Sequence, residues 1–280
     1  MMMGKIYLVP TPIGNLKDIT LRALEVLENC DLVAAEDTRQ SLKLLNHFNI
    51  KKPLVSYHKY NEGVKAEELI RRAREGQNIA VVSDAGSPGI SDPGEVIVKR
   101  CIEENVEFEV LPGATAIITG LVYSGLDTTK FLFRGFLPRE NKERLPIIDE
   151  VKNSKETLIF YEAPHRLIAT LTFLREHLGN RRAVAARELT KLHEEIIRGT
   201  LEEIINHYEN VEPRGEYVLL IEGKTLEEIK EEQEALWKDL TIGEHIVRYM
   251  EEGYNKKEAI KKVAKDRGLP KSEVYKHTIL

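Results

Sequence analysis

A long loop, Val82–Gly94, places the strongest constraint on the fold of this chain. Its thirteen residues include three glycines, two prolines and the aspartates Asp84 and Asp92. Residues 76–82 before it form a short apolar stretch typical of a strand, and residues 95–104 after it have the apolar spacing of a helix packed on a sheet. A loop that only reverses the chain needs a few residues. This arrangement therefore predicts an α/β fold with a binding loop at the carboxyl end of a strand.

Strand and helix patterns alternate along most of the chain. The first half predicts strands at 5–10, 32–35, 54–57, 76–82 and 106–111, with helices at 21–29, 41–48, 65–75, 95–104 and 117–124. The second half predicts strands at 131–136, 157–161, 183–186 and 217–221, with helices at 139–152, 165–178 and 201–208. Because the links are short, we expect a mostly parallel sheet. Asp18 or Thr20 is expected to cap the helix at 21–29.

Five turn-rich loops follow predicted strands directly, at 10–16, 36–39, 83–94, 112–116 and 162–166. The carboxyl ends of parallel strands meet at one edge of a sheet, so these loops predict a single crevice. No G-x-G-x-x-G motif follows the first strand, and no G-x-x-x-x-G-K-[ST] motif occurs in the sequence. We therefore expect a ligand without a diphosphate, such as a small zwitterion that carries a carboxylate and ribose hydroxyls.

The 280 residues suffice for two medium domains, predicted at 1–115 and 116–225, with a linker helix and helical tail at 226–280. A net charge of −5 means that any binding of nucleic acid depends on local basic patches. Cys30 and Cys101 lie in apolar helical patterns and are expected to be reduced core residues of a cytoplasmic protein. We expect no signal peptide, membrane span or metal site, since none of their sequence patterns is present.

Seven segments resemble, in order, those of the bacterial 16S rRNA (cytidine 2′-O)-methyltransferases, a branch of the tetrapyrrole-methylase-like superfamily. The segments are LVPTPIGNL (8–16), AAEDTR (34–39), SDAGSPGISDPG (83–94), LPGATA (111–116), FYEAPHR (160–166), ARELTK (186–191) and GEYVLLIEG (215–223). The resemblance implies two α/β domains of the tetrapyrrole methylase type, with a cleft for S-adenosylmethionine between them and a small C-terminal helical domain. It further implies a homodimer and, as substrate, a decoding-centre cytidine of 16S rRNA, free or in the assembled small subunit.

The same resemblance implies which residues contact the cofactor. Transferred position by position, these are Ile13, Asp84, Ser87, Thr115, Ala116, Tyr161, Leu189 and Tyr217. The Asp84 carboxylate can accept hydrogen bonds from an ammonium group or from ribose hydroxyls, and an aromatic face can lie near a sulfonium. The alternative for Asp84 is that it only caps its own loop.

A base near the ribose 2′-hydroxyl would assist the reaction, because a protonated hydroxyl is a weak nucleophile. Asp37 and Glu36 are the favoured candidates, and His165 is the next. Arg39 offers an alternative reading, in which it simply forms an ion pair with one of these carboxylates. The predicted loops contain three further candidates, Glu162, Glu188 and Lys191. The sequence does not single out one base.

Basic side chains near aromatic residues indicate where RNA could bind. Arg134 and Arg139 lie in or just after the phenylalanine-rich strand 131–136, although these rings could equally form its core face. Arg39 and Arg166 suit phosphate contacts better than proton transfer.

The tail predicts helices at 241–250, 255–265 and 271–277, which together resemble a helix-turn-helix unit. Lys271 and Lys276 lie in the recognition-helix position. After residue 240, nine lysines and arginines oppose six acidic residues, which favours contact with RNA. A bundle that mediates dimer contacts is the alternative.

The sequence thus predicts an S-adenosylmethionine-dependent ribose methyltransferase of 16S rRNA. One rival hypothesis is methylation of a tetrapyrrole or a protein side chain on the same scaffold. Another is a regulator without catalytic activity that binds nucleic acid through its tail, which would leave the five loops unexplained and predicts no cofactor binding.

Overall fold

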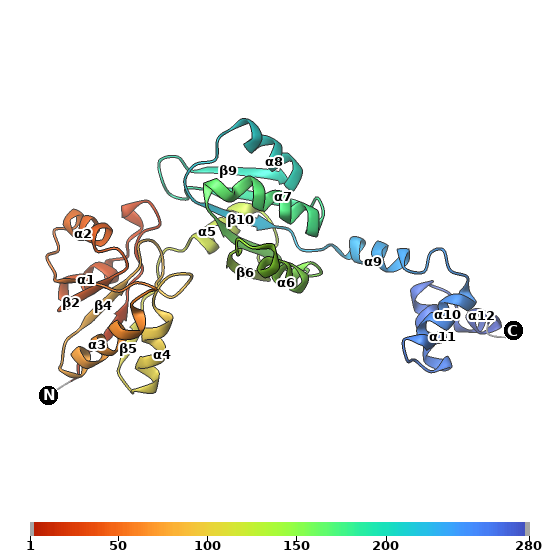
Figure 1. The fold of residues 1–280 in the computed structure, drawn as a ribbon, viewed down its shortest axis with the longest axis horizontal. Helices are drawn as coiled ribbons and strands as arrows, with labels where there is room; N and C mark the ends of the chain where they lie inside the picture. Colours follow the sequence, from red (N-terminus) through yellow and green to blue (C-terminus); the bar gives the residue numbers. More distant parts are fainter. Residues whose placement is uncertain (1–2, 278–280) are drawn as a thin grey trace. The chain divides into compact units, whose positions relative to one another are not determined.

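The computed structural model describes residues 3–277, except for the side chains of residues 226, 232 and 233. The chain forms two compact units (Figure 1). The first comprises the chain up to Val151 together with Glu156–Glu222, and the second comprises Lys152–Lys155 and the chain from Gly223 onward. Each unit is described in turn.

The first unit begins with a parallel five-stranded sheet in the order β3-β2-β4-β1-β5. Its strands are β1 (Ile6–Leu8), β2 (Leu32–Ala35), β3 (Leu54–Ser56), β4 (Ile79–Val82) and β5 (Phe108–Val110). The connecting helices are α1 (Leu21–Asn29), α2 (Thr38–His47), α3 (Glu62–Arg74) and α4 (Glu95–Glu103). The parallel sheet predicted for this half is therefore confirmed.

Alternate residues of these strands face two separate cores. In β4, Ile79 and Val81 pack with α3 and α4, whereas Ala80 and Val82 pack with α1 and α2. Helices thus cover both faces of the sheet, as parallel sheets require (Figure 1). The predicted cap of α1 is Thr20, whose side chain accepts a hydrogen bond from the Ala23 amide. Asp18 lies instead in a short 3-10 turn, Leu16–Asp18.

The second sheet has the order β6-β7-β10-β8-β9 and is mixed. Only β6 and β7 are parallel, and every other neighbouring pair is antiparallel. The strands are β6 (Phe131–Phe136), β7 (Thr157–Glu162), β8 (Arg182–Arg187), β9 (Glu195–Thr200) and β10 (Tyr217–Ile221). The helices are α5 (Ala116–Ser124), α6 (Asn141–Val151), α7 (Leu167–Leu178) and α8 (Leu201–Asn210). A short 3-10 turn, Pro164–Arg166, precedes α7.

The sequence-based prediction of a mostly parallel sheet is wrong for this half, and β9 was not predicted. The strand β9 returns beside β8 as a hairpin partner, with Arg182 opposite Thr200. Thr200 then caps α8, so the strand runs directly into a helix. An alternation of strands and helices does not reveal such a pairing, because parallel and antiparallel strands share the same local pattern.

The two faces of the second sheet are also covered. Helices α6, α7 and α8 pack with Phe160 and Leu219 on one face, while α5 packs with Ile159 and Val218 on the other. Ile13, from the loop after β1, joins the α5 cluster and is 8% exposed. Burial of such a side chain stabilises by about 1.5–3 kcal/mol, so Ile13 helps to hold the two sheets together.

The second unit is helical, with α9 (Leu226–Ala235), α10 (Ile242–Glu251), α11 (Lys256–Asp266) and α12 (Lys271–Lys276). Capping boxes begin α10 at Thr241 and α11 at Asn255, and the helices α10–α12 share a small apolar core. The three predicted tail helices are therefore confirmed. Within the described chain, no helix is long and apolar enough to cross a membrane. Cys30 and Cys101 are buried, free thiols.

Candidate active site

A cavity of about 540 Å³ lies in the first unit between loops of the first sheet and one edge of the second. Loops that follow β1, β2 and β4 form one wall. The ends of β7 and β8 and the beginning of β10 form the other wall. Because β10 runs antiparallel to both β7 and β8, its first residues lie at the same edge as their last residues.

Backbone hydrogen bonds fold the long loop of residues 83–94 back on itself and join it to a neighbouring loop. Thr11 and Gly86 exchange two backbone hydrogen bonds of 2.9 and 3.0 Å, which join this loop to the one after β1. The Gly89 amide donates to the Pro93 carbonyl at 3.2 Å. A side chain at Gly94 would place its Cβ 2.7 Å from the Gly89 nitrogen, so only glycine fits there. The composition that marked this loop in the sequence thus has a steric cause.

All eight residues predicted to contact the cofactor line this one cavity. They are Ile13, Asp84, Ser87, Thr115, Ala116, Tyr161, Leu189 and Tyr217. They come from loops and strands of both sheets, so the fold brings together positions as far apart in the sequence as Ile13 and Tyr217. That they contact a cofactor stays a prediction.

The three predicted catalytic residues occupy different surroundings. Glu36 and the exposed His165 line the cavity. Asp37 is not among the lining residues; it caps α2 by accepting a hydrogen bond from the Arg39 amide. The Arg39 guanidinium also pairs with the Asp37 carboxylate at 2.7 Å, and these bonds from Arg39 lower the pKa of Asp37 to about 2. The alternative prediction, that Arg39 forms an ion pair with one of these carboxylates, is therefore confirmed.

Four carboxylates gather near one another at the cavity: Glu36, Asp84, Asp92 and Glu216. Burial and then the nearby charges of Glu36, Asp84 and Glu216 raise the pKa of Asp92 to about 7. Burial also raises the pKa of Asp84, which accepts a 2.9 Å hydrogen bond from the Asp37 amide. The pKa of Glu36 is raised by burial and by Asp84. Within the described residues, no cluster of side chains has the make-up of a metal site.

Aromatic and apolar side chains form the remaining wall. The Tyr161 ring meets the Phe133 ring edge-on at 5.0 Å and the Phe136 ring at 5.5 Å between centroids. Burial, followed by the charge of Asp92, raises the pKa of Tyr161 to about 12, so its hydroxyl keeps its proton at neutral pH. The cavity thus combines several carboxylates with a ring and aliphatic groups.

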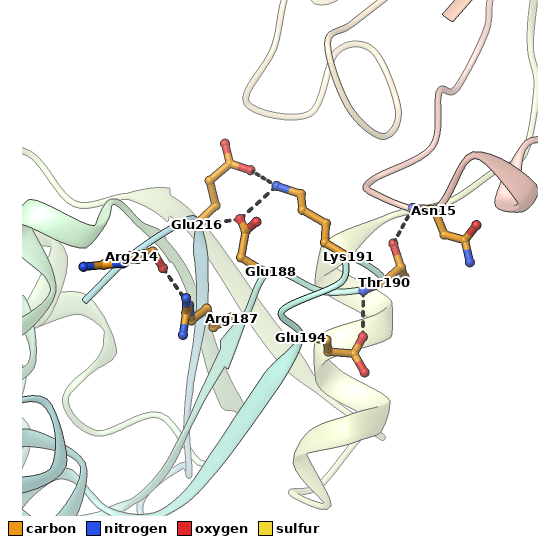
Figure 2. A network of polar contacts seen from close by, with 8 residues as sticks. All are labelled: Asn15, Arg187, Glu188, Thr190, Lys191, Glu194, Arg214 and Glu216. Carbon is orange, nitrogen blue, oxygen red and sulfur yellow. Dashed lines mark hydrogen bonds and ion pairs between the residues drawn. The ribbon is translucent and has the colours of Figure 1, made fainter. Parts of the chain in front are cut away.

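The loop after β8 is held by a polar network (Figure 2). The Lys191 ammonium donates to Glu188 at 2.9 Å and to Glu216 at 3.0 Å. Burial tends to lower the pKa of Lys191, but these two hydrogen bonds outweigh it and raise the pKa, so the side chain is a cation rather than a base. Thr190 accepts a 3.0 Å hydrogen bond from the amide of Asn15, which lies in the loop after β1. Both walls of the cavity are therefore connected directly.

The arginines predicted to bind RNA differ in how free they are. Arg134 pairs with Glu150 at 2.8 Å, and Arg139 is exposed. Arg166 is committed to the protein, since it donates to the Leu137 carbonyl at 2.6 Å. Arg39 has 87% of its side chain exposed while it pairs with Asp37.

In the second unit, Lys271 and Lys276 are exposed on α12. Their position on the surface of that helix leaves both ammonium groups accessible to a polyanion.

Among the lining residues that sequence reasoning did not assign to the site are Asp92, Phe136 and Glu216. Asp92 lies in the loop that the sequence emphasised, but nothing there distinguishes it from Asp84. Glu216 precedes its strand instead of following it, so a search of the carboxyl ends of strands could not find it. The phenylalanine-rich stretch did signal Phe136, although as part of an RNA surface.

Comparison with known proteins places this geometry in context. The family model described as Tetrapyrrole (Corrin/Porphyrin) Methylases matches residues 5–205. A protein of Halalkalibacterium halodurans named ribosomal RNA small subunit methyltransferase I is 49% identical, over 97% of this chain and 93% of its own length. Proteins of the same name from Bacillus subtilis and Thermotoga maritima are 49% and 44% identical, over 98% and 79% of this chain and 93% and 100% of their own.

Solved structures share the fold at lower identity. Diphthine synthase superposes with a TM-score of 0.66 at 16% identity, covering 80% of this chain and 91% of that chain. Uroporphyrin-III C-methyltransferase from Thermus thermophilus, in a complex with S-adenosyl homocysteine, gives a TM-score of 0.57 at 21% identity. This superposition covers 78% of the present chain and 97% of that chain.

Proposed function

The chain belongs to the tetrapyrrole (corrin/porphyrin) methylase family, and we propose that within it this protein is a methyltransferase of small-subunit ribosomal RNA. The observation that carries the proposal is 49% identity, over nearly the whole chain, to two proteins of that name. The cofactor is S-adenosylmethionine and the acceptor is the ribose 2′-hydroxyl of a decoding-centre cytidine in 16S rRNA. The protein works in the cytoplasm, where ribosomal subunits are assembled.

The cavity fits this cofactor chemically. S-adenosylmethionine supplies an electrophilic methyl group on a positively charged sulfur, and it also carries an ammonium group. Asp84 and its neighbouring carboxylates suit these positive charges, and Tyr161 presents a ring near them. Ile13, Ala116 and Leu189 offer apolar surface to the rest of the molecule, and Lys191 offers a cation to a carboxylate.

The residues of both walls orient the reaction. Methyl transfer requires the acceptor oxygen, the methyl carbon and the sulfur to lie in line, so fixed walls contribute much of the rate. The Thr11–Gly86 bonds hold the first wall together, and the Asn15–Thr190 bond fixes it relative to the second. Glu36 and His165, which the sequence offered for assisting the acceptor hydroxyl, both line the cavity.

The decisive experiment measures transfer of labelled methyl from S-adenosylmethionine to undermethylated small subunits, with free 16S rRNA in parallel. We expect the label at one cytidine ribose, mapped by the resistance of the adjoining bond to alkaline cleavage. Transfer to a base, a protein or a porphyrinoid instead would contradict the proposed substrate. The absence of cofactor binding would contradict the enzyme itself.

RNA is contacted by exposed basic groups, because the chain as a whole is negatively charged. We assign Arg139, Lys271 and Lys276 to this role because they are exposed. Arg39 and Arg134 also contribute to it, although each forms an ion pair with a carboxylate of the protein. Arg166 instead holds the turn after β6 and acts on RNA indirectly.

Charge reversal tests the tail. Each lost phosphate contact lowers, by about one, the steepness with which the logarithm of the RNA-binding constant falls with the logarithm of the salt concentration. The double variant Lys271→Glu with Lys276→Glu should therefore lower this steepness by about two. The matched control is Lys51→Glu, an exposed lysine of the first unit. An unchanged slope, together with a change in oligomeric state, would favour the dimer-contact role of the tail.

A homodimer is the proposed assembly. The outward face of α5 exposes Ile118, Val122 and Tyr123, of which Val122 is 70% exposed. Three large apolar residues side by side on one helix favour burial against a second copy. Val122→Asp is expected to convert a dimer to a monomer in analytical ultracentrifugation, and a monomeric parent protein would contradict this assignment.

A further inference from the structure

Asp92 has an unusual position in the active-site cavity. It lies at the end of the 83–94 loop, where Ser91 before it adopts a left-handed φ of +64°. The bond from Gly89 to Pro93 closes the backbone around it. Ser91 packs so closely on Gly135 of β6 that a Cβ there would lie 3.3 Å from the serine oxygen. These contacts fix the backbone that carries Asp92 into the cavity.

The other carboxylates of the cavity are already engaged. Asp84 accepts a hydrogen bond from the Asp37 amide, and Glu36 accepts one from the Asp84 amide. Glu162 is buried and accepts from the Thr170 hydroxyl at 2.5 Å. Glu188 and Glu216 both accept from Lys191.

Among the lining carboxylates in the described part of the chain, Asp92 alone accepts no hydrogen bond. A partly buried carboxylate without a donor has its full acceptor capacity left for a ligand.

The surrounding charges make this group suitable for proton transfer. Glu36, Asp84 and Glu216 face it with negative charge, Tyr161 faces it with a neutral hydroxyl, and His165 and Lys191 line the same cavity. Burial and these charges raise its pKa to about 7, which suits a base that works near neutral pH. By contrast, Asp37 is a poor base, since its pKa is lowered to about 2 by Arg39.

We propose that Asp92 is the general base of the reaction, a role that rests on the proposed function. As the ribose oxygen bonds to the methyl carbon, the carbon–sulfur bond breaks and its electron pair stays on sulfur, which becomes neutral. The hydroxyl proton passes to an oxygen of Asp92. The resulting carboxylic acid then loses that proton to water, so the enzyme is regenerated.

The test compares wild type, Asp92→Asn and Asp92→Glu in single-turnover methyl transfer to undermethylated small subunits between pH 5 and 9. General-base catalysis contributes roughly 10²–10⁴-fold, so we expect Asp92→Asn to be at least about 10²-fold slower at saturating substrate. The low-pH limb of the wild-type profile should disappear in this variant and return in Asp92→Glu. The affinity for S-adenosylmethionine should change only a few-fold. Glu95→Gln removes a charge three residues away, outside the cavity, and is the control.

A second readout is independent of activity. In protein with ¹³C-labelled aspartate carboxyls and without cofactor, one resonance should titrate near pH 7 and be missing from Asp92→Asn. If Asp92→Asn does not fold, the wild-type protein alone still tests the role of Asp92. The role is overturned if no carboxyl resonance titrates near pH 7 and the wild-type rate profile has no low-pH limb. An Asn variant within threefold of wild type, with the same profile, also overturns it. A wild type that methylates no form of the rRNA contradicts the proposed function instead.

Discussion

The two sheets of the first unit contribute to the same cavity in different ways. The first sheet is entirely parallel and contributes through loops that follow its strands, which supply Glu36, Asp84 and Asp92. The second sheet is mixed and contributes at both ends of its strands: Tyr161 at the end of β7, and Glu216 just before β10. The first sheet thus presents three carboxylates on loops, and the second presents a ring, a lysine and the carboxylate of Glu216 close to its edge.

This difference shows how strand direction decides which residues can reach a site. In a parallel sheet, every strand ends at the same edge, so the residues of a crevice follow a simple rule. In a mixed sheet, an antiparallel strand brings its first residue to that edge. The four predictions that follow test this division between the two sheets, from the largest expected effect to the smallest.

Gly94→Ala should disturb the carboxylate loops of the first sheet most strongly. The new Cβ would lie 2.7 Å from the Gly89 nitrogen, which is backbone and cannot rotate away, so the loop must open. A misplacement of about 1 Å near reacting groups costs roughly 10²-fold in rate, and we expect a loss of that order in methyl transfer. The control is Gly125→Ala, where φ is +71° but no atom lies within 4 Å. This variant should lose about 1–2 kcal/mol of stability and keep its activity. Equal losses of activity would contradict the steric argument.

Lys191→Met should weaken the edge of the second sheet. It leaves Glu188, which has 19% of its side chain exposed, without its cation, and we expect the free energy of unfolding to fall by about 1–2 kcal/mol. Double-mutant cycles in urea divide the effect. Coupling to Glu188→Gln should exceed coupling to Glu216→Gln, because Glu216 has 81% of its side chain exposed and exposed pairs contribute about 0.2–1 kcal/mol. The reverse order would show that exposure does not control this network.

Asp92→Asn should change the pH dependence of thermal stability in the cofactor-free protein. The pKa of this carboxyl is raised from 3.8 when unfolded to about 7 when folded, so the folded state binds the proton more tightly. The stability that Asp92 contributes in its protonated form is thus complete below pH 3.8 and is lost as the pH rises through about 7, a loss that asparagine avoids. We expect the variant to gain on the order of 1 kcal/mol, or roughly 2–4 °C in Tm, at pH 8 and little at pH 4. An equal change in Tm at both pH values would contradict the raised pKa.

Asp37→Asn should have the smallest effect, although Asp37 was a favoured base on sequence grounds. Asparagine also caps helices, so α2 should persist, and methyl transfer should stay within about threefold of wild type. The low pKa of Asp37 contributes stability above its unfolded value of 3.8, lost as pH falls through about 2, so the variant should differ from wild type in acid resistance alone. A loss of 10²-fold at neutral pH would restore Asp37 as the base and contradict the role of Asp92.

The sequence alone determined where nearly every strand and helix lies and which loops gather at the cavity. Local patterns suffice for this, since apolar periodicity and turn residues act within a few positions of one another. Thr20 as a cap, the loop of residues 83–94 and the helices of the tail all follow from such short-range chemistry. The resemblance to a family added the eight residues that the fold brings to one cavity.

Only the tertiary structure decided the direction of strands in the second half and the partner of each charged group. The strand β9 and the reversed β10 depend on pairing between distant segments, which leaves no local signal. In the same way, the sequence favoured Asp37 for proton transfer and gave no signal for Asp92. Arg39 lies against the first, while no donor among the described residues reaches the second. The acidity of a carboxylate depends on its burial and on the charges around it, and both arise only when the chain has folded.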